Sequence, residues 1–527
     1  MDDAAITLGV LAAAVALFVW NRLPVAAVAL GAALALYAAG VLSLEQSVAG
    51  FGDPTVLFIA SLFVISEALD ASGVTTWAGQ RLVHAARGDP TRLVVFVLLL
   101  CALLSAVITP NGAIAALLPM MVVIATRIGR PASKLLMPLA FSAHAGSLLV
   151  LTGSPVNILV SEAAADAGAG RFGFFEFALV GVPLVAGSVV LVLALGDRLL
   201  PDRRARSLPP DLSRHAETLL HQYAPARGPR PREVPAQLFT RAVGVAEVVV
   251  PPRSPLIGQT VFPGMVTESG DLVVLSVQRG GDEPPGPELV VAAGDALLLE
   301  GSWRALDERL GADEVLVVDP PEAVRRQVVA LGPGARRTLA VTAAFVVVLA
   351  AGLAPAAVAG LLAAMALVLL GALDTEQAYR AVSWTTVILI AGLIPVSQAI
   401  QTTGAADDVA GVLVDVVGGS SPYLLLAGLF LIAAVFSVAV SNTATALILI
   451  PIALAAAAEL DVAIQPVLMS VAVACSASFL TPISTPGNLI VMGPAGYRFG
   501  DYWRFGLPFV GLFFLVAVFL VPVVWPL

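Results

Sequence analysis

The chain has 527 residues, of which 58% are hydrophobic and 12% are charged, and its mean hydropathy is +0.94. Soluble domains average about 25% charged residues, so this composition excludes a soluble globular protein and indicates a polytopic membrane protein. The net charge of −9 is spread over loops and an insert, so we expect no nucleic-acid partner. The two cysteines, Cys101 and Cys475, lie in apolar runs and predict no disulfide framework.

Apolar segments predict the helices of the first half. The chain begins Met-Asp-Asp and lacks the positive region of a cleaved signal peptide, so we interpret the first segment as a retained span. Several segments are short for a hydrocarbon core about 30 Å thick. The segments lie at about 5–20, 24–42, 54–71, 92–108, 113–127, 135–151, 156–165 and 174–197.

Short polar loops join two pairs of these segments. Segments 92–108 and 113–127 flank Thr109-Pro110-Asn111-Gly112 and predict a re-entrant hairpin that does not cross the bilayer. Segments 135–151 and 156–165 flank Thr152-Gly153-Ser154-Pro155 and predict one crossing helix, unwound in its middle. Unwound backbone at membrane depth is tolerated only beside a cavity or a bound ion. Five crossings remain, an odd number, so we expect the second half to be inverted.

The middle of the chain has a different composition. Residues 201–235 are rich in Pro and Arg and predict a linker, and residues 244–310 contain short β-like runs separated by Pro and Gly turns. We therefore expect a small α/β domain with its core at about 236–320. The predicted organisation is a first membrane repeat at 1–198, a cytoplasmic linker and domain at 199–335, and a second membrane repeat at 336–527.

The second half predicts the same series of elements as the first. Its apolar segments lie at about 338–353, 355–373 and 385–402, followed by a hairpin at 422–458, a broken helix at 466–492 and a last segment at 505–525. The tip of the hairpin is Ser441-Asn442-Thr443.

Polar positions recur at a fixed distance of 331 residues. Asn111 pairs with Asn442 at the hairpin tips, and Asn157 pairs with Asn488 in the broken helices. The offset also pairs Pro24 with Pro355, Glu45-Gln46 with Glu376-Gln377, Ser66 with Ser397, Gly73 with Gly404 and Pro155 with Pro486. Corresponding broken segments in two halves indicate a transporter's binding site. The predicted fold is an all-α polytopic membrane protein with two inverted-topology repeats and a small cytoplasmic α/β insert.

The distribution of charge predicts the orientation in the membrane. If both termini lie outside, the basic residues from Arg22 to Lys134, in the linker, and from Arg336 to Arg504 all lie in the cytoplasm. The opposite loops carry seven acidic residues and one basic residue, Arg171. The positive-inside rule favours this orientation. We expect a multi-pass protein of the plasma (inner) membrane with residues 198–335 in the cytoplasm.

Hydroxyl and amide side chains gather at the two tips and the two broken loops, and none of them is ionisable. Neutral oxygens suit a hard cation such as Na⁺, and helix N-termini suit an anion. The alternative is that these residues only cap helices. Their recurrence in both halves favours a binding site. The residues are Thr109, Asn111, Thr152, Ser154, Asn157, Ser441, Asn442, Thr443, Thr481, Ser484, Thr485 and Asn488.

Two ionisable residues within spans are candidates for proton-linked roles. Glu67 is replaced by Gln398 in the second half, and His144 is replaced by Cys475. Ionisable groups inside the membrane are functional candidates by default. Glu67 can instead be hydrated near the end of its span, and His144 can be an interior histidine whose hydrogen bonds are satisfied.

The second-half motifs resemble a known family. SNTATALILIPIAL, the paired broken loops and the ending TPISTPGNLIVMGPAGYRFGDYWRFGLP are similar to the divalent-anion/sodium symporter family of the ion transporter superfamily. The resemblance implies an elevator transporter, usually a homodimer, whose Ser-Asn-Thr tips and adjacent loops bind sodium and a dicarboxylate or sulfate. The first tip departs from this pattern, because it reads Pro110-Asn111-Gly112. The insert resembles the C-terminal domain of TrkA-type (RCK) potassium-transport regulators, some of which bind small ligands.

The resemblance and the residue chemistry together assign roles to the loops. For the anion we expect contacts from Asn111, Gly112, Thr152, Ser154, Asn442, Thr443, Thr485 and Pro486. For sodium we expect contacts from Thr109, Asn111, Gly153, Asn157, Ser441, Asn442, Ser484 and Asn488.

Three functions remain open on the sequence. The first is sodium-coupled symport of a small divalent anion, with Na⁺ as coupling ion and no organic cofactor. The second is cation/proton antiport, which a titrating group at the site would favour. The third is a membrane sensor that acts through its cytoplasmic domain. With no metal-ligand spacing and no nucleophile–base pair, we expect no enzyme. Expected partners are the anion, the lipid bilayer, a second copy of the chain and a small regulatory ligand at the insert.

The predicted orientation can be tested by labelling. A cysteine introduced at position 2 should react with a membrane-impermeant thiol reagent in intact cells, because the N-terminus is expected outside. A cysteine introduced at position 202 should react only after the cells are opened. An unreactive position 2 in intact cells would contradict the orientation.

Overall fold

The computed structural model describes residues 3–527 with the exception of 21, 75–76, 79–80, 82–88, 128–129, 204–242, 268–269, 280–288, 311–314, 320, 322–323, 325–330, 333, 418–420 and 439. Most of the expected linker therefore lies outside the described residues. The chain folds as two compact units. One comprises Met1–Ala68, Arg81–Pro209 and Arg337–Leu527, and the other comprises Leu69–Gln80 and Pro210–Arg336.

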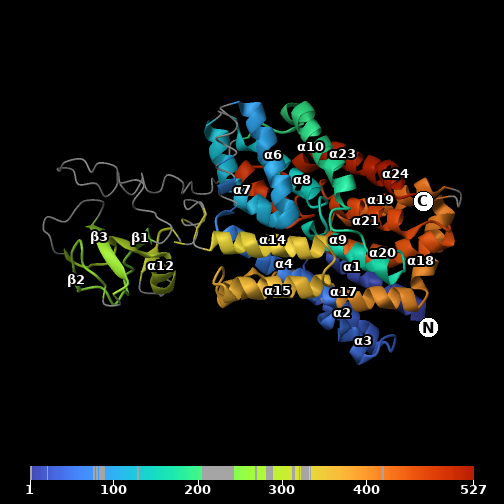
Figure 1. Cartoon of the computed structure of the whole chain (residues 1–527), viewed down its shortest axis with the longest axis horizontal. Coiled ribbons are helices and arrows are strands. Elements are labelled where there is room, and N and C mark those ends of the chain that lie inside the picture. Colours follow the sequence, from blue (N-terminus) through green and yellow to red (C-terminus); the bar gives the residue numbers. More distant parts are fainter. Residues whose placement is uncertain are drawn as a thin grey trace. The chain divides into compact units, whose positions relative to one another are not determined.

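The first unit is helical (Figure 1), and its first half follows the apolar segments closely. Its elements are α1 (Asp3–Trp20), α2 (Val25–Ala38), α3 (Leu44–Val48), η1 (Ala49–Gly52), α4 (Pro54–Ala71), α6 (Pro90–Val107), α7 (Pro110–Arg127), η2 (Ala132–Lys134), α8 (Leu136–Gly146), η3 (Leu151–Gly153), α9 (Pro155–Asp166) and α10 (Ala178–Leu199).

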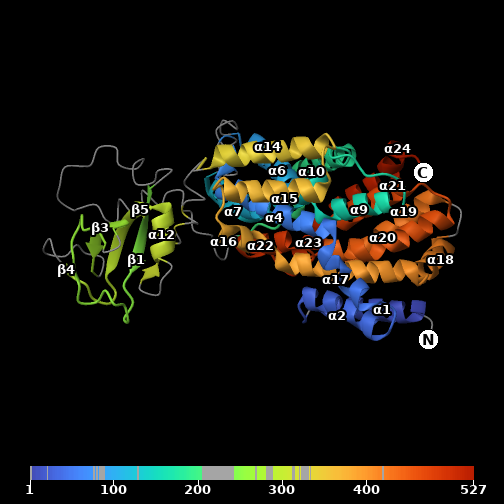
Figure 2. The same cartoon turned by 60° about the horizontal axis from the view of Figure 1, so that its bottom comes forward.

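The second half of the chain repeats this series. Its elements are α14 (Ala335–Ala350), α15 (Ala356–Leu369), α16 (Thr375–Ala381), α17 (Trp384–Thr402), α18 (Ala405–Val417), α19 (Pro422–Phe436), α20 (Asn442–Glu459), α21 (Ile464–Ser476), α22 (Pro486–Ala495), α23 (Phe499–Leu515), the π-helical turn η5 (Val516–Leu520) and α24 (Val521–Val524). Both termini lie at the same end of this unit in the two views (Figures 1 and 2).

The 331-residue offset is visible in local structure as well as in sequence. Helices α2 and α15 begin and end at positions that differ by 331. Helices α3 and α16 both begin with a capping box, from Ser43 and Gln46 in one and from Asp374 and Gln377 in the other. A capping box satisfies two backbone donors that a helix start leaves free. The duplicated sequence thus produces duplicated helix ends.

The two halves pack on each other in a reciprocal, exchanged way. Helix α2 of the first half contacts α17 of the second, and α15, the counterpart of α2, contacts α4, the counterpart of α17. Gly392 on α17 packs on Ala29 of α2, where a Cβ would lie 2.9 Å from the Ala29 carbonyl carbon. Gly360 on α15 packs on Ser61 of α4, where a Cβ would lie 2.2 Å from the Ser61 Oγ. Ala29 and Gly360, like Ser61 and Gly392, are 331 residues apart. Small residues therefore allow the same close contact twice between the two halves.

Both expected broken helices are present. α8 ends at Gly146 and α9 begins at Pro155, while α21 ends at Ser476 and α22 begins at Pro486. The hairpin helices α6 and α7 are joined through Ile108 and Thr109. Proline at the first helical position is favourable because that residue's N–H has no helical partner. The unwound segments predicted from Gly, Ser and Pro are confirmed.

Six helical segments within the described residues are long and apolar enough to cross a membrane. They are Asp3–Trp20, Leu44–Ala71, Ala178–Leu199, Trp384–Thr402, Asn442–Glu459 and Phe499–Val524. The shorter apolar helices, of 10–17 residues, are Val25–Ala38, Thr91–Val107, Ala356–Leu369, Pro422–Phe436 and Ile464–Ser476.

The second unit contains a four-stranded antiparallel sheet of order β3-β5-β1-β6. The helix α12 packs on β1 and β5 of this sheet (Figure 2). A two-stranded ribbon pairs β2 with β4. The elements are β1 (Val243–Val249), β2 (Thr260–Val261), β3 (Leu272–Gln278), β4 (Leu289–Val290), β5 (Ala296–Ser302), α12 (Trp303–Leu310) and β6 (Leu316–Val317).

The insert has its own apolar core. Trp303 is 3% exposed and packs among strand residues such as Val245 and Leu298. Arg279 pairs with the buried Asp295 through Nη2 and Oδ2 at 2.7 Å. The Arg279 guanidinium holds the pKa of Asp295 below its ordinary value. The β-like runs of the sequence thus form a packed sheet.

The exchanged helix packing predicts a sensitive glycine. Gly392→Val should lower the apparent melting temperature of the purified protein, because a side chain would meet the backbone of Ala29 and Leu30, both 2.9 Å from a Cβ. Overpacking of this kind costs about 1–3 kcal/mol. Gly31→Val on α2 is the matched control, since nothing lies within 4 Å of its Cβ position. Equal melting temperatures for the two variants would contradict this packing.

Candidate functional site

Four helices of the first unit begin at the predicted polar loops. They are α7, α9, α20 and α22, and a Ser or Thr hydroxyl accepts a backbone N–H in the first turn of each. The bonds run from Gly112 N to Thr109 Oγ1 (3.3 Å), from Val156 N to Ser154 Oγ (3.2 Å), from Ala444 N to Ser441 Oγ (3.4 Å) and from Asn488 N to Thr485 Oγ1 (3.3 Å). The capping role of these residues is therefore present. The remaining free N–H groups give each helix start a partial positive charge.

An asparagine closes each unwound loop. The Asn157 Nδ2 donates to the carbonyls of Ser147 (2.8 Å) and Val150 (3.0 Å). The Asn488 Nδ2 donates to the carbonyls of Ser478 (2.8 Å) and Thr481 (3.2 Å). The donors and both acceptors are each 331 residues apart. One carboxamide thus satisfies two carbonyls that the broken helix leaves without partners.

The same two asparagines leave an acceptor unused. Both are fully buried, and neither the Asn157 Oδ1 nor the Asn488 Oδ1 has a hydrogen-bond partner among the described residues. A buried amide oxygen without a partner costs about 1–3 kcal/mol. Such a group in a native protein calls for an explanation, and a bound ion is one. The fact that it occurs at the same position in both halves argues against an accident of packing.

The first tip lies against the second broken loop. A Cβ on Gly487 would lie 3.0 Å from the Asn111 Oδ1 and 2.5 Å from the Ile114 Cδ1. The His144 Nε2 forms a 3.1 Å hydrogen bond with the Thr485 Oγ1. Residues of α7, α8 and α22 therefore meet, and in the exchanged arrangement α20 packs on α9. Neither half builds its loops into a site by itself.

The second tip is tied to the loop of its own half. Ser478 Oγ donates to the Asn442 Oδ1 at 2.5 Å, and Thr481 Oγ1 donates to the Val438 carbonyl at 3.1 Å. Ser484 Oγ donates to the Thr481 carbonyl at 2.8 Å. The second tip and the second loop therefore form one hydrogen-bonded group.

The first tip has a packing reason for its departure from Ser-Asn-Thr. A Cβ on Gly112 would lie 3.0 Å from the Ile108 Cγ2 and 3.6 Å from the Ser66 Oγ of α4. A threonine at this position would therefore crowd Ile108, while Ser66 lies at an ordinary contact distance. The glycine leaves the Asn111 amide as the tip's polar side chain.

The other predicted residues lie on the same loops, with one exception. Four of them, Thr152, Gly153, Thr443 and Pro486, lie in or beside the polar loops. Thr152, Gly153 and Thr443 are buried. Glu67 lies on α4, next to Ser66 and outside the four polar helix starts. Its proton-linked role stays a prediction.

A cavity of 290 Å³ runs along two of the four helices. Its walls include Leu159 of α9 and Leu447 of α20, each within about one turn of a predicted site residue, together with Ser397 of α17. Asp53, Glu162 and Asp166 also line it, and Arg171 pairs with Glu162 at 2.8 Å. None of the polar-loop residues is among those that line this cavity.

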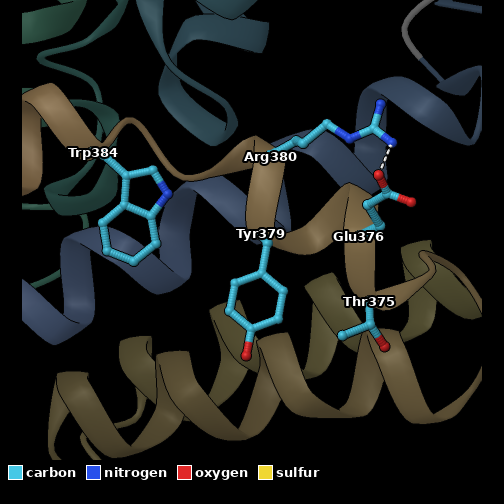
Figure 3. Close-up of a pocket in the computed structure, with 5 residues that line it drawn as sticks. All are labelled: Thr375, Glu376, Tyr379, Arg380 and Trp384. Carbon is cyan, nitrogen blue, oxygen red and sulfur yellow. Dashed lines mark ion pairs between the residues drawn. The ribbon is translucent and has the colours of Figure 1, made fainter.

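A second depression of 590 Å³ surrounds the short helix α16 (Figure 3). It is lined by Thr375, Glu376, Tyr379, Arg380 and Trp384, and Arg380 is paired with Glu376 at 2.5 Å. It contains none of the polar-loop residues. Its aromatic side chains are exposed, as is usual for residues that face a membrane interface.

Sequence reasoning missed two serines. The backbone carbonyls of Ser147 and Ser478 each accept the asparagine Nδ2 of their loop, and the Ser478 hydroxyl also donates to the Asn442 Oδ1 of the second tip. Both follow the 331-residue offset, so the repeat itself could have found them. The hydroxyl and amide side chains of the polar loops are all uncharged. Among the described residues, no three His, Cys, Asp or Glu side chains converge as ligands for a metal ion.

Comparison with known families decides the class of the protein. The model of the CitMHS family, described as citrate transporter, matches residues 15–474 and 414–526. The chain belongs to this family. It is therefore a secondary transporter and a multi-pass membrane protein, and not an enzyme.

Relatives of this family member extend over its whole length. It is 29% identical to the uncharacterized transporter YfbS of Escherichia coli, over 98% of each chain. It is 24% identical to the sodium/sulfate cotransporter 1 of Chlamydomonas reinhardtii, over 52% of this chain and 32% of that one. The crystal structure of the Alcanivorax borkumensis YdaH transporter matches with a TM-score of 0.50 and 14% identity, covering 97% of this chain and 98% of that chain. That likeness concerns the fold alone.

The hydrogen bond between His144 and Thr485 can be measured by a double-mutant cycle. His144→Phe and Thr485→Val, made singly and together, should show a coupling of about 1 kcal/mol in stability, because either substitution alone removes the same buried bond. The measurement is denaturant unfolding in detergent. The pair His144→Phe and Thr443→Val is the control and should be additive. Additivity in both cycles would contradict the cross-repeat bond.

Proposed function

We propose that this transporter carries a small divalent anion, a dicarboxylate or sulfate, together with sodium. The observation that carries the proposal is the pair of buried amide oxygens on Asn157 and Asn488 that have no hydrogen-bond partner among the described residues. Each lies in the first turn of a capped helix that follows an unwound loop. The pair supports two cation positions, one in each half.

The chemistry of the loops fits sodium as the coupling ion. Hard cations prefer oxygen ligands, and the polar loops offer hydroxyl, amide and backbone carbonyl oxygens without a carboxylate. Neither the Asn157 Oδ1 nor the Asn488 Oδ1 has a hydrogen-bond partner among the described residues, although the His144 imidazole lies near enough to interact with the Asn488 side chain. Asn111, Asn442, Ser441, Ser484, Thr109 and Gly153 would complete the two sets. The orphaned oxygens would then gain the partner that burial requires.

The anion would bind where the four helix starts converge. Free backbone N–H groups at a helix N-terminus favour negative charge, and two bound cations would add to the attraction. Asn111, Gly112, Thr152, Ser154, Asn442, Thr443, Thr485 and Pro486 lie at these starts. The similarity to a sodium/sulfate cotransporter over half of the chain supports the same pairing of ion and anion.

The exchanged packing of the halves supports an inverted repeat working by an elevator movement. In transporters built from repeats one bundle moves against another, and in an elevator movement the moving bundle carries the binding site with it. We place repeat 1 at residues 1–198 and repeat 2 at 336–527, with both termini outside and a homodimer as the assembly. The insert at 199–335 would be a cytoplasmic TrkA-C-like (RCK) domain that tunes turnover through a small ligand.

Two alternatives are kept. Cation/proton antiport would be favoured by His144, which is 3% exposed and bonded to Thr485. A sensor acting through the insert is disfavoured by the polar loops in both halves. The absence of a carboxylate from the tips favours symport over antiport.

Uptake by proteoliposomes tests the proposal. Labelled sulfate, succinate or citrate should accumulate only when a sodium gradient is directed inward. Asn442→Ala should abolish this uptake, because a methyl group replaces neither the oxygen nor the amide donors. Gln465→Ala is the matched control, since this amide bonds the Ala169 carbonyl outside the polar loops.

The outcomes separate the alternatives. Uptake driven by a proton gradient without sodium would contradict the coupling ion. Sodium/proton exchange without anion uptake would favour the antiporter. Normal uptake by the Asn442→Ala protein at normal expression would remove the site from the second tip.

A further inference from the structure

The short helix α22 joins the second polar loop to residues at the end of the first half. Thr485 and Asn488 lie at its N-terminus, and Gly496 ends it in a left-handed conformation with φ 66°. A helix rises about 1.5 Å per residue, so the two ends of α22 are only about 15 Å apart. A displacement of its C-terminus is therefore carried to the polar loop.

Arg203 holds the C-terminus of α22. Its Nη1 donates to the Gly496 carbonyl at 3.1 Å and to the Asp501 Oδ2 at 2.6 Å, and its Nη2 donates to the Asp501 Oδ1 at 3.1 Å. Bidentate pairs of this kind fix geometry as well as energy. The side chains of Arg203 and Asp501 are 27% and 12% exposed, so solvent screens the pair only partly. A cation at a helix C-terminus is also favourable to the helix dipole.

The backbone that carries Arg203 is itself anchored. Ser133 Oγ donates to the Pro201 carbonyl at 2.7 Å and accepts from the Arg203 N–H at 3.0 Å. Tyr497 donates its hydroxyl to the Ser133 carbonyl at 2.5 Å and accepts from the Met137 N–H at 2.9 Å. Hydrogen bonds therefore join three segments: the start of α8, the chain after α10 and the chain after α22. We call this hydrogen-bonded group the knot.

Tyr502 connects this knot to the polar loop. Its hydroxyl donates to the backbone carbonyl of Asn488 at 2.6 Å. Its ring is fully buried and packs edge-on against Tyr497, with centroids 5.8 Å apart. A buried tyrosine hydroxyl needs such a partner. Tyr502 follows Asp501 in the first turn of α23. The turn that is bonded to Arg203 through Asp501 is therefore also bonded to the Asn488 carbonyl through Tyr502.

We propose that Arg203 and Tyr502 are positioning residues for the second cation position. Arg203 fixes the end of α22 and the start of α23, and Tyr502 fixes the backbone of Asn488, whose amide oxygen faces the ion. This inference rests on the proposed function, because it assigns an outer layer to that sodium site. Outer-layer partners of a metal ligand orient it and set its affinity.

Arg203 also lies where the chain leaves the helical unit toward the insert, and it is the last residue described before residue 243. A link from the insert to the site would pass Arg203 and would reach Asn488 through α22 and α23. Regulation by the insert would then appear as a change in sodium affinity, because a regulator shifts an equilibrium only by binding its states unequally.

Two measurements on the purified full-length protein test the inference. The first is hydrogen–deuterium exchange of residues 484–495, which does not require the transported ions to be known. The second is thermal stabilisation by sodium chloride, with choline chloride as the ionic-strength control. Arg203→Gln and Tyr502→Phe should both speed exchange in this segment. Both should raise the half-saturating sodium concentration about tenfold, the lower end of the effect of outer-layer partners.

Matched variants separate positioning from general damage. Arg130→Gln removes an exposed pair with Asp197, 3.5 Å apart at the end of α10, without touching α22 or α23, and should behave as the wild type. Exchanging the charges in Arg203→Asp with Asp501→Arg should recover part of the lost sodium affinity. If Arg203→Gln fails to fold, Tyr502→Phe and Arg203→Lys, which keeps the charge without the bidentate geometry, carry the test.

The outcomes for this inference and for the proposed function are distinct. A wild-type protein that does not respond to sodium would contradict the proposed sodium coupling, and exchange of residues 484–495 would then decide the positioning alone. The inference would be overturned if the wild type responds to sodium and both Arg203→Gln and Tyr502→Phe show the same sodium titration and the same hydrogen–deuterium exchange as the wild type. Faster exchange with a weaker sodium response in both variants would support it.

Discussion

The structure depends on how an interrupted helix can be accommodated inside a membrane protein. Breaking α8 from α9, or α21 from α22, frees backbone carbonyls that lipid cannot hydrate, and each would cost several kcal/mol if it stayed unpaired. Asn157 and Asn488 satisfy two carbonyls each with one amide group. That closure leaves the amide oxygens and the helix starts available for ligands. The same asparagine side chains thus satisfy the carbonyls freed by the interruption and present the oxygens of the candidate site.

The exchanged packing explains why both halves are needed. Asn111 of the first tip lies against Gly487 of the second loop, and His144 bonds Thr485 across the repeats. The first tip and the second broken loop are therefore also positioned by contacts with the other half. The two halves are also unequal, because Gly112 packs near Ser66 and the second tip keeps its hydroxyls. The two tips therefore present different sets of polar side chains.

The insert is a separate unit with its own core, placed in sequence between the two membrane halves. Its chain leaves the helical unit at a knot of hydrogen bonds around Ser133, Arg203 and Tyr497. Within this group of hydrogen bonds Arg203 contacts the end of α22, the ten-residue helix whose first turn contains Asn488.

The sequence alone determined the helices, the breaks and the pairing of polar residues, because hydropathy, proline and the 331-residue repeat are properties of neighbouring residues in one chain. It also identified Asn157 and Asn488 as special. Only the tertiary structure decided that their amide groups bind the carbonyls of Ser147 and Ser478 and that their oxygens have no hydrogen-bond partner among the residues the structure describes. The bonds of His144 to Thr485 and of Arg203 to Asp501 join residues about 300 or more positions apart. No local pattern encodes such partners, because they arise from the packing of one half against the other.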